Sequence, residues 1–479
     1  MHQKYFRLAS IAALMMGSAT ALALPFNSYD PRSMAMGSAG VAVGDPSTAP
    51  FFNPALLTAS DPKLKYSVEF PIIGVRVYDP GNMEKNLPIL SNNISALNTS
   101  ITAANASANS TDPNVIKLLP GQMTTVANNI TKVNNSLSSL SNQPLQGELG
   151  AAAVVGVPGK DYGVAFYTDA WMAMGGTLEY NDATTLSNLS TSVQAAANAL
   201  SATTGAGAAA CTAVQNGTGT AADITNCLAA STAINNSLVT AQGAVNFSTA
   251  TGIASKIHLR GVIIRETGLS LSHGFVVNDK SWSLGITPKI MQLHLFDALL
   301  AANTGNSTSG LTGGDYLAKY DNSFNFDLGA GKSYLNGWRT GVTVKNVIPR
   351  SYDFKRAPTA GATPVPIGSS LKINPLVRAG VSHENDWSTV AFDLDLTQND
   401  PAGLENKSQY AALGGELNAL SWAQFRAGYR ADLLNSERNV TSVGLGISPR
   451  IPYFKFHFDL AYAYNKKEQG ASLRFGLNF

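Results

Sequence analysis

The sequence predicts an all-β transmembrane barrel of about 14 antiparallel strands, with an N-terminal plug in the lumen and helical hairpins inserted in outer loops. Its last residues, Ala471 to Phe479, alternate apolar and polar side chains and end on an aromatic residue. Charged residues make up 13% of the chain, against about 25% in ordinary soluble proteins. After the N-terminal segment, no run approaches about 18 consecutive apolar residues, so a membrane-spanning chain must close as a barrel.

The N-terminus has the features of a signal peptide. Lys4 and Arg7 form a basic start, an apolar stretch follows over residues 8–20, and Ala21-Leu22-Ala23 matches a cleavage site. We therefore expect residues 1–23 to be removed, the mature chain to begin at Leu24, and the protein to be exported to the outer membrane of a Gram-negative bacterium.

Fourteen alternating stretches have about the 9–11 residues that a tilted membrane strand needs. The even number fits single-chain bacterial barrels, and the connections alternate between long and short, as outer loops and periplasmic turns do. The predicted strands are residues 64–78, 147–158, 162–171, 257–274, 282–296, 323–334, 338–348, 371–383, 387–397, 408–418, 422–433, 440–448, 453–464 and 470–479.

Two long connections, residues 79–146 and 172–256, predict extracellular insertions in a barrel domain that spans residues 61–479. Apolar residues in the first recur at helical spacing, as in Leu87, Leu90, Ile94, Leu97 and Ile101, and again over residues 119–140. The second insertion shows the same helical spacing of apolar residues, more weakly, over residues 186–200 and 234–245. Because the remaining positions are mostly Asn, Ser, Thr and Ala, low-complexity disorder is the alternative to helical hairpins.

The two cysteines of the chain, Cys211 and Cys227, both lie in the second insertion. In an exported protein such a pair is expected to form a disulfide. Their spacing is too wide for a C-x-x-C redox motif, and without nearby histidines they make a poor zinc site.

Residues 24–60 are rich in Gly, Ala, Pro and Ser and show no sustained period. The segment contains Met34, Met36, Phe51 and Phe52, which favour a compact plug inside the barrel over the alternative of a disordered tail.

Alternation places ionisable side chains of both signs on the inner face of the strands. This argues against a simple charge-selective pore and for pairing within the lumen or with an inserted segment. The predicted inward-facing residues are Arg339, Lys345, Arg378, Asp393, Asp395, Glu416, Arg426, Arg430, Asp432, Lys455, Asp459 and Arg474.

Catalytic, cofactor and nucleic-acid sites are not indicated. Gly329-Ala330-Gly331-Lys332-Ser333 lacks the first glycine of a phosphate loop, since Phe326 stands there, and no nucleophile elbow accompanies His273 or His383. The formal net charge of +2 is spread without a basic run, which gives nucleic-acid binding little support. We expect no enzyme activity, no cofactor and no metal.

Two resemblances refine the prediction. Asp45, Thr48 and the motif Asn53-Pro54-Ala55, followed by about fourteen strands, resemble FadL-type fatty-acid transporters, whose hatch contains an NPA motif. The opening MGSAGVAVGD…FFNPALL and residues 344–350, VKNVIPR, are more similar to the exported barrel family of TraF-type conjugal transfer proteins. A thioredoxin-like protein shares the TraF name, but the absence of C-x-x-C excludes that chemistry here.

The FadL resemblance implies a plugged barrel that passes hydrophobic small molecules, captured by outer loops and released towards the wall when the plug shifts near Asn53–Ala55. The TraF resemblance implies another class of function, in which the barrel is an anchor and the helical insertions contact a surface or conjugation partner. Outer-membrane lipid surrounds the barrel in both.

Overall fold

The computed structural model describes most of the chain in separate ranges. These are residues 22–23, 29–58, 66–204, 207–229, 255–277, 280–301, 317–356, 365–420, 422–449 and 455–478. The basic start and apolar stretch of the expected signal peptide lie outside them. Among the described residues, no helix has both the length and the hydropathy to cross a membrane.

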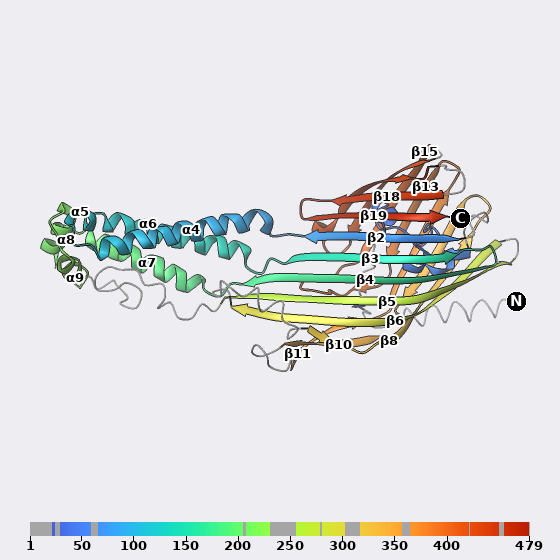
Figure 1. Ribbon diagram of the computed structural model, residues 1–479, viewed down its shortest axis with the longest axis horizontal. Helices are drawn as coiled ribbons and strands as arrows, with labels where there is room; N and C mark the ends of the chain where they lie inside the picture. The colour runs from blue at the N-terminus through green and yellow to red at the C-terminus, as the bar shows by residue number, and fades with distance from the viewer. Residues whose placement is uncertain are drawn as a thin grey trace.

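Fourteen antiparallel strands form a closed barrel, which confirms the predicted fold class (Figure 1). Each strand pairs with its neighbours, and the last strand pairs with the first, Leu473 opposite Ile73. The strands are β2 (Ser67–Tyr78), β3 (Leu145–Val157), β4 (Tyr162–Glu179), β5 (Lys256–Val277), β6 (Lys280–Ala301), β8 (Ser323–Ser333), β9 (Trp338–Lys345), β12 (Leu376–Glu384), β13 (Ser388–Asp395), β15 (Tyr410–Leu420), β16 (Ala423–Asp432), β17 (Val440–Ile447), β18 (Lys455–Tyr464) and β19 (Glu468–Asn478).

The two faces of the wall differ as the alternation predicts. On β19, Gly470, Ser472 and Arg474 are buried towards the lumen, whereas Ala471 and Phe475 are exposed on the outside. Exposed aromatic residues gather near the short turns, including Tyr162, Trp282, Trp338, Trp387 and Trp422. Such a girdle below an apolar band is typical of a membrane barrel. We call this the short-turn end.

The predicted strand at residues 371–383 is wrong in one respect. Asn374 and Pro375 interrupt it, so Leu371–Ile373 belong to β11 (Val365–Ile373) and the barrel strand begins at Leu376. Together with β10 (Arg350–Arg356), β11 forms a separate two-stranded hairpin inside a connection predicted to be a plain loop. Proline cannot donate to a ladder, which explains the break. Short strands β1 (Leu22–Ala23), β7 (Leu317–Lys319) and β14 (Gln398–Asn399) complete the sheets.

Six helices project from the other end of the barrel, which we call the helix end (Figure 1). Because α6 packs between α4 and α7, α4 buries only a narrow stripe: Leu97 is buried, whereas Leu87 and Ile94 of the predicted seam are exposed. Both insertions share one apolar core. Predicted residues 234–245 lie outside the described ranges. The helices are α4 (Met83–Ala108), α5 (Pro113–Ile116), α6 (Leu119–Leu140), α7 (Ala183–Leu200), α8 (Ala208–Asn216) and α9 (Ala221–Ala229).

The disulfide predicted from the sequence is present between Cys211 on α8 and Cys227 on α9. It joins two short helices at the tip of the helical extension (Figure 1).

Residues 29–58, which we call the lumen segment, lie inside the barrel. The segment contains α2 (Pro31–Ala35), α3 (Ala49–Phe52) and the 3₁₀ turn η1 (Pro54–Thr58). Its backbone approaches inward-facing glycines of the wall so closely that a Cβ on Gly428 would lie 2.1 Å from the Gly37 nitrogen. The small residues of the wall thus make room for the segment. The alternation of apolar and polar residues does not predict this close contact between the segment and the wall.

Candidate functional site in the barrel lumen

The Asn53-Pro54-Ala55 motif fixes the lumen segment to the wall. Asn53 is fully buried, and its Nδ2 donates to the carbonyl oxygens of Val41 (3.0 Å) and Ala330 on β8 (3.1 Å). Its Oδ1 accepts from the Ala55 backbone nitrogen at 3.1 Å. One amide side chain therefore ties the start of η1 both to the segment itself and to the barrel.

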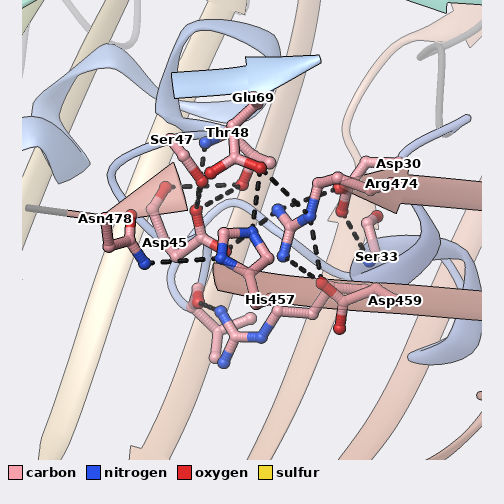
Figure 2. Close-up of polar contacts among 12 residues, drawn as sticks. Asp30, Ser33, Asp45, Ser47, Thr48, Glu69, His457, Asp459, Arg474 and Asn478 are labelled. Atoms are coloured by element: carbon pink, nitrogen blue, oxygen red, sulfur yellow. Dashed lines mark hydrogen bonds and ion pairs between the residues drawn. The ribbon is translucent and has the colours of Figure 1, made fainter. Parts of the chain in front are cut away.

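Arg474 on β19 is the centre of a buried charge cluster (Figure 2). Its Nη1 lies 3.2 Å from Asp30 Oδ1 and 3.1 Å from Asp45 Oδ2, both on the lumen segment. Its Nη2 lies 2.8 Å from Asp459 Oδ2 on β18. Beside it, His457 Nε2 lies 2.9 Å from Glu69 Oε2 on β2. A single guanidinium thus joins the last two strands to the segment. The buried guanidinium is stable there because carboxylates pair with it.

The two aspartates of the segment respond to this guanidinium in opposite directions. Burial opposes ionisation of Asp45, but Arg474 and Arg32 outweigh it and hold the pKa of Asp45 below its usual value. Burial dominates at Asp30 and raises its pKa, although Arg474 acts against the shift.

A second set of ion pairs continues the cluster along the wall. Arg32 of α2 forms an ion pair with Glu416 on β15, with Nε 2.9 Å from Oε2, and its Nη1 donates to the Val43 carbonyl at 2.7 Å. Arg426 on β16 bridges Glu416 and Asp459, so the charges form a continuous ladder.

Four more of the predicted lumen charges also lie on the inner face. Arg378 pairs with Asp395 and donates to the Ser38 carbonyl at 3.2 Å. Asp393 Oδ2 accepts from the backbone nitrogens of Gly40 and Val41 at 2.8 and 2.9 Å. Arg430 pairs with Glu468. Nine of the predicted inward-facing residues are 7% exposed or less: Arg378, Asp393, Asp395, Glu416, Arg426, Arg430, Asp432, Asp459 and Arg474.

Asp432 differs from the others in its contacts. Its Oδ1 accepts from the backbone nitrogens of Gln409 and Leu434, at 3.2 and 3.0 Å, so it closes a turn at the helix end of the barrel. It does not touch the lumen segment through these bonds.

Sequence reasoning missed a further polar group deeper in the lumen. Lys289 on β6 is buried between Glu266 on β5 and Asp327 on β8, with Nζ 3.0 Å from an oxygen of each. Tyr29 of the lumen segment donates to Asp169 Oδ2 on β4 at 2.7 Å. The same two-residue alternation that placed the other charges would have placed these on the inner face.

An apolar interior lies between the lumen segment and the β10–β11 hairpin. Phe51 and Phe52 of the segment, Trp171 of β4 and Tyr352 and Phe354 of the hairpin belong to one buried cluster. The hairpin is held over it by Asp297 of β6, which pairs with Arg356 and, at 2.8 Å, with Arg260. In most membrane barrels the interior is polar, so an apolar interior suits a hydrophobic ligand.

The wall is interrupted where Phe70 and Pro71 form a bulge in β2. Pairing with β19 shifts register there, between Glu69 and Ile72 on the β2 side, and pairing with β3 shifts at the same place. This strand is therefore held less continuously than its neighbours.

Within the described ranges, no three His, Cys, Asp or Glu side chains gather closely enough to hold a metal ion. The ionised groups of the lumen pair with one another and with the segment.

A family model described as "F plasmid transfer operon, TraF, protein" matches residues 50–395, most of the chain. The chain belongs to this family. The predicted resemblance to TraF-type proteins is thereby confirmed, and FFNPALL and VKNVIPR lie within the matched range. No curated protein is detectably similar to this TraF-family barrel in sequence.

The TraF-family barrel is also similar to solved structures of low sequence identity. The toluene transporter TbuX of Ralstonia pickettii is 12% identical, with a TM-score of 0.45 over 95% of this chain and 99% of its own. The P. putida toluene transporter TodX is 10% identical, with a TM-score of 0.43 over 95% and 99%. A FadL homologue of Pseudomonas aeruginosa is 10% identical, with a TM-score of 0.45 over 96% and 99%.

Proposed function

We propose that this TraF-family barrel lies in the outer membrane of a Gram-negative bacterium and passes small hydrophobic molecules through its lumen. The observation that carries the proposal is the apolar interior enclosed between the lumen segment and the β10–β11 hairpin. Phe51, Trp171 and Phe354 come from three separate parts of the chain and belong to one buried apolar cluster. Such an interior favours apolar ligands, since their transfer from water is driven by the loss of exposed apolar surface.

The lumen segment acts in this proposal as the plug, within an N-terminal domain of residues 24–60. A ligand captured at the helix end reaches the apolar interior, and a shift of the chain around Asn53–Ala55 opens the way towards the wall. The Asn53 bonds to Val41 and Ala330 must break for that shift. The bulge at Phe70 and Pro71, where strand pairing is interrupted on both sides, is the part of the wall that yields.

The test is uptake of a radiolabelled monoaromatic hydrocarbon and of a long-chain fatty acid by cells that carry Asn53→Ala. We expect uptake to fall to background while the barrel keeps its heat-modifiable mobility on gels. Asn325→Ala is the matched control. Asn325 is equally buried, but its amide bonds to Ile348, with Nδ2 to the Ile348 oxygen at 3.0 Å, and not to the segment. Normal uptake by a folded Asn53→Ala variant would contradict the proposal.

A second function is favoured by the helical extension. The extension has its own apolar core, separate from that of the barrel. A self-contained bundle outside the membrane is suited to contact another surface, and the name of the family points to conjugal transfer. In this alternative the barrel is an anchor and the extension, built from the insertions predicted at residues 79–146 and 172–256, is the contact element.

Replacing residues 83–140 and 183–254 by short Gly-Ser linkers separates the two functions. Transport predicts normal hydrocarbon uptake and normal mating by the shortened protein. The contact function predicts loss of mating or cell contact, and no uptake that depends on the barrel in either the parent or the shortened protein. In both cases the gel mobility of the barrel reports whether it still folds.

A further inference from the structure

A groove of about 690 Å³ in the membrane-facing wall crosses five adjacent strands, β2 to β6. Figure 1 shows these strands side by side. One row of directly opposite residues crosses it: Ile73 faces Ala151, Ala151 faces Ala170, Ala170 faces Arg265, and Arg265 faces Gln292. The small alanines in the middle of this row leave the hollow, and Phe70 and Ile290 lie at its two sides. Its volume lies within the range of small-molecule pockets, about 300–1,000 Å³, and leaves room for part of an acyl chain.

Arg265 gives the groove a positive charge on the side that faces lipid. Its neighbour Ile264 is buried towards the lumen, whereas Arg265 is exposed. In the described ranges, no carboxylate lies within ion-pair distance of Arg265. Asp169, which also lines the groove, has its carboxylate engaged by the Tyr29 hydroxyl on the inner side. An unpaired arginine on a lipid-facing wall is unfavourable unless the membrane supplies an anion.

Other polar groups extend this charge towards the helix end. Lys319 of β7 lies opposite His294 of β6, two residues beyond Gln292 on the same face, and is exposed. Gln292 Nε2 donates to Asn322 Oδ1 at 3.4 Å, and both side chains line the groove. Asp321, also exposed, follows in the same connection. The groove thus has mostly apolar walls and is lined by one cation, Arg265, and two amides, with Lys319 and Asp321 beyond its helix-end side.

The level of Arg265 on the wall corresponds to a headgroup region. His273 of β5 stacks on Tyr162 in the aromatic girdle at the short-turn end, with ring centroids 4.6 Å apart. The strand from His273 to Arg265 is about 26 Å long at ~3.3 Å per residue, which is about 20 Å along the membrane normal at the usual tilt. Because the apolar band of such barrels is about 25 Å tall, Arg265 lies near its upper edge.

We propose that this groove binds a phosphate-bearing glycolipid of the outer leaflet. An acyl chain lies over Ala151, Ala153 and Ala170, and a phosphate group pairs with the Arg265 guanidinium, assisted by Lys319. A guanidinium binds phosphate through two parallel hydrogen bonds, which a small neutral headgroup cannot replace. The inference rests on the membrane placement given under Proposed function, but it is independent of any ligand that passes through the lumen.

The experiment uses the full-length barrel, purified in a mild detergent and examined by native mass spectrometry with added lipid A. We expect wild type to hold one bisphosphorylated lipid A and to bind dephosphorylated lipid A at least tenfold more weakly. The double variant R265Q/K319Q is expected to lose at least tenfold in occupancy. The control is Lys332→Gln, since Lys332 lies at the short-turn end, with its Nζ over the rings of Trp282 and Tyr334 (4.6 and 4.7 Å). That variant should bind as wild type does.

Three results would overturn the inference: equal binding of the phosphorylated and dephosphorylated lipids, full occupancy in R265Q/K319Q, or displacement of the lipid by inorganic phosphate at equal concentration. Since the comparison of the two lipids needs only wild type, the inference stays testable if the variant does not fold. Cell fractionation tests the membrane placement separately, so its failure is distinguishable from failure of the groove.

Discussion

Arg474 on the last strand and Asp45 near the middle of the lumen segment form a direct ion pair, with Nη1 3.1 Å from Oδ2. The pair joins two positions that are far apart in the sequence, one of which closes the barrel. The same guanidinium also contacts Asp30 and Asp459. Closure of the wall and placement of the segment therefore depend on one side chain.

Replacing Arg474 by Gln should strongly destabilise the barrel and release the lumen segment. The change leaves three carboxylates, two of them buried, without their shared cation, and removal of one partner from a buried pair costs about 3–5 kcal/mol. Urea-dependent unfolding in lipid vesicles measures the loss.

Lys467→Gln is the control for that experiment. Lys467 pairs with Glu437 on the surface, where the two side chains are 31% and 50% exposed. Exposed pairs contribute about 0–1 kcal/mol. Equal effects of the two substitutions would show that the cluster at Arg474 does not hold the segment.

Acid should loosen the lumen segment only at a pH well below the usual pKa of an aspartate. The pKa of Asp45 is lowered in the folded protein, so its stabilising contribution is complete above about pH 4, the unfolded value. The contribution is lost as the pH falls through the depressed folded value. The pKa of Asp30 is raised in the folded protein, so Asp30 takes up a proton at a higher pH in the folded protein than in the unfolded chain. Protonation of Asp30 therefore favours the folded segment as the pH falls through this raised pKa.

A nitroxide label at Pro46→Cys reports the mobility of the segment by electron paramagnetic resonance as the pH is lowered. We expect little change down to pH 4 and release in stronger acid. Asp45→Asn should make the segment mobile already at neutral pH and remove the acid step. A transition near pH 6 in the parent protein would contradict this account.

Gly428→Ala should displace the lumen segment, because the new Cβ would lie 2.1 Å from the Gly37 nitrogen and 2.3 Å from the Met36 carbonyl carbon. Overpacking of this kind costs about 1–3 kcal/mol. Limited proteolysis should cleave residues 29–58 faster in this variant.

Gly415→Ala provides the matched control on the neighbouring strand. A Cβ there meets nothing nearer than the Thr389 oxygen at 3.9 Å. We expect wild-type proteolysis and stability from this variant. Protection of the segment in Gly428→Ala equal to that in Gly415→Ala would contradict the close backbone contact.

The number of strands and the sides on which charges lie could be predicted from the sequence, because both depend only on local alternation. Arg426 and Asp459 could be placed on the inner face from their own strands. Their partners could not, since Arg32 and Asp45 come from a segment without regular period. Which segment residue meets which wall residue depends on the path of residues 29–58 through the lumen.

The β10–β11 hairpin shows a different limit. Leu371 and Ile373 continue the alternation of the strand that begins at Leu376, so the pattern merges two elements into one. Only the proline at 375 marks the boundary, and one proline also occurs at strand starts and bulges. The sequence also does not show how far a strand extends beyond the membrane. Strand β4 runs on to Glu179, past the predicted end at residue 171, because the barrel wall continues outside the lipid.

Removal of the disulfide should loosen the tip of the helical extension and leave the barrel intact. Cys211 and Cys227 are 16 residues apart, and closing a loop of that size contributes about 3 kcal/mol. The core that surrounds them belongs to the extension and not to the barrel. In Cys211→Ser/Cys227→Ser we expect faster hydrogen exchange over residues 207–229, with unchanged heat-modifiable mobility. Reductant should reproduce this change in the parent protein and have no effect on the double variant. Loss of the heat-modifiable gel mobility of the barrel would mean that the apolar core of the extension and that of the barrel are coupled.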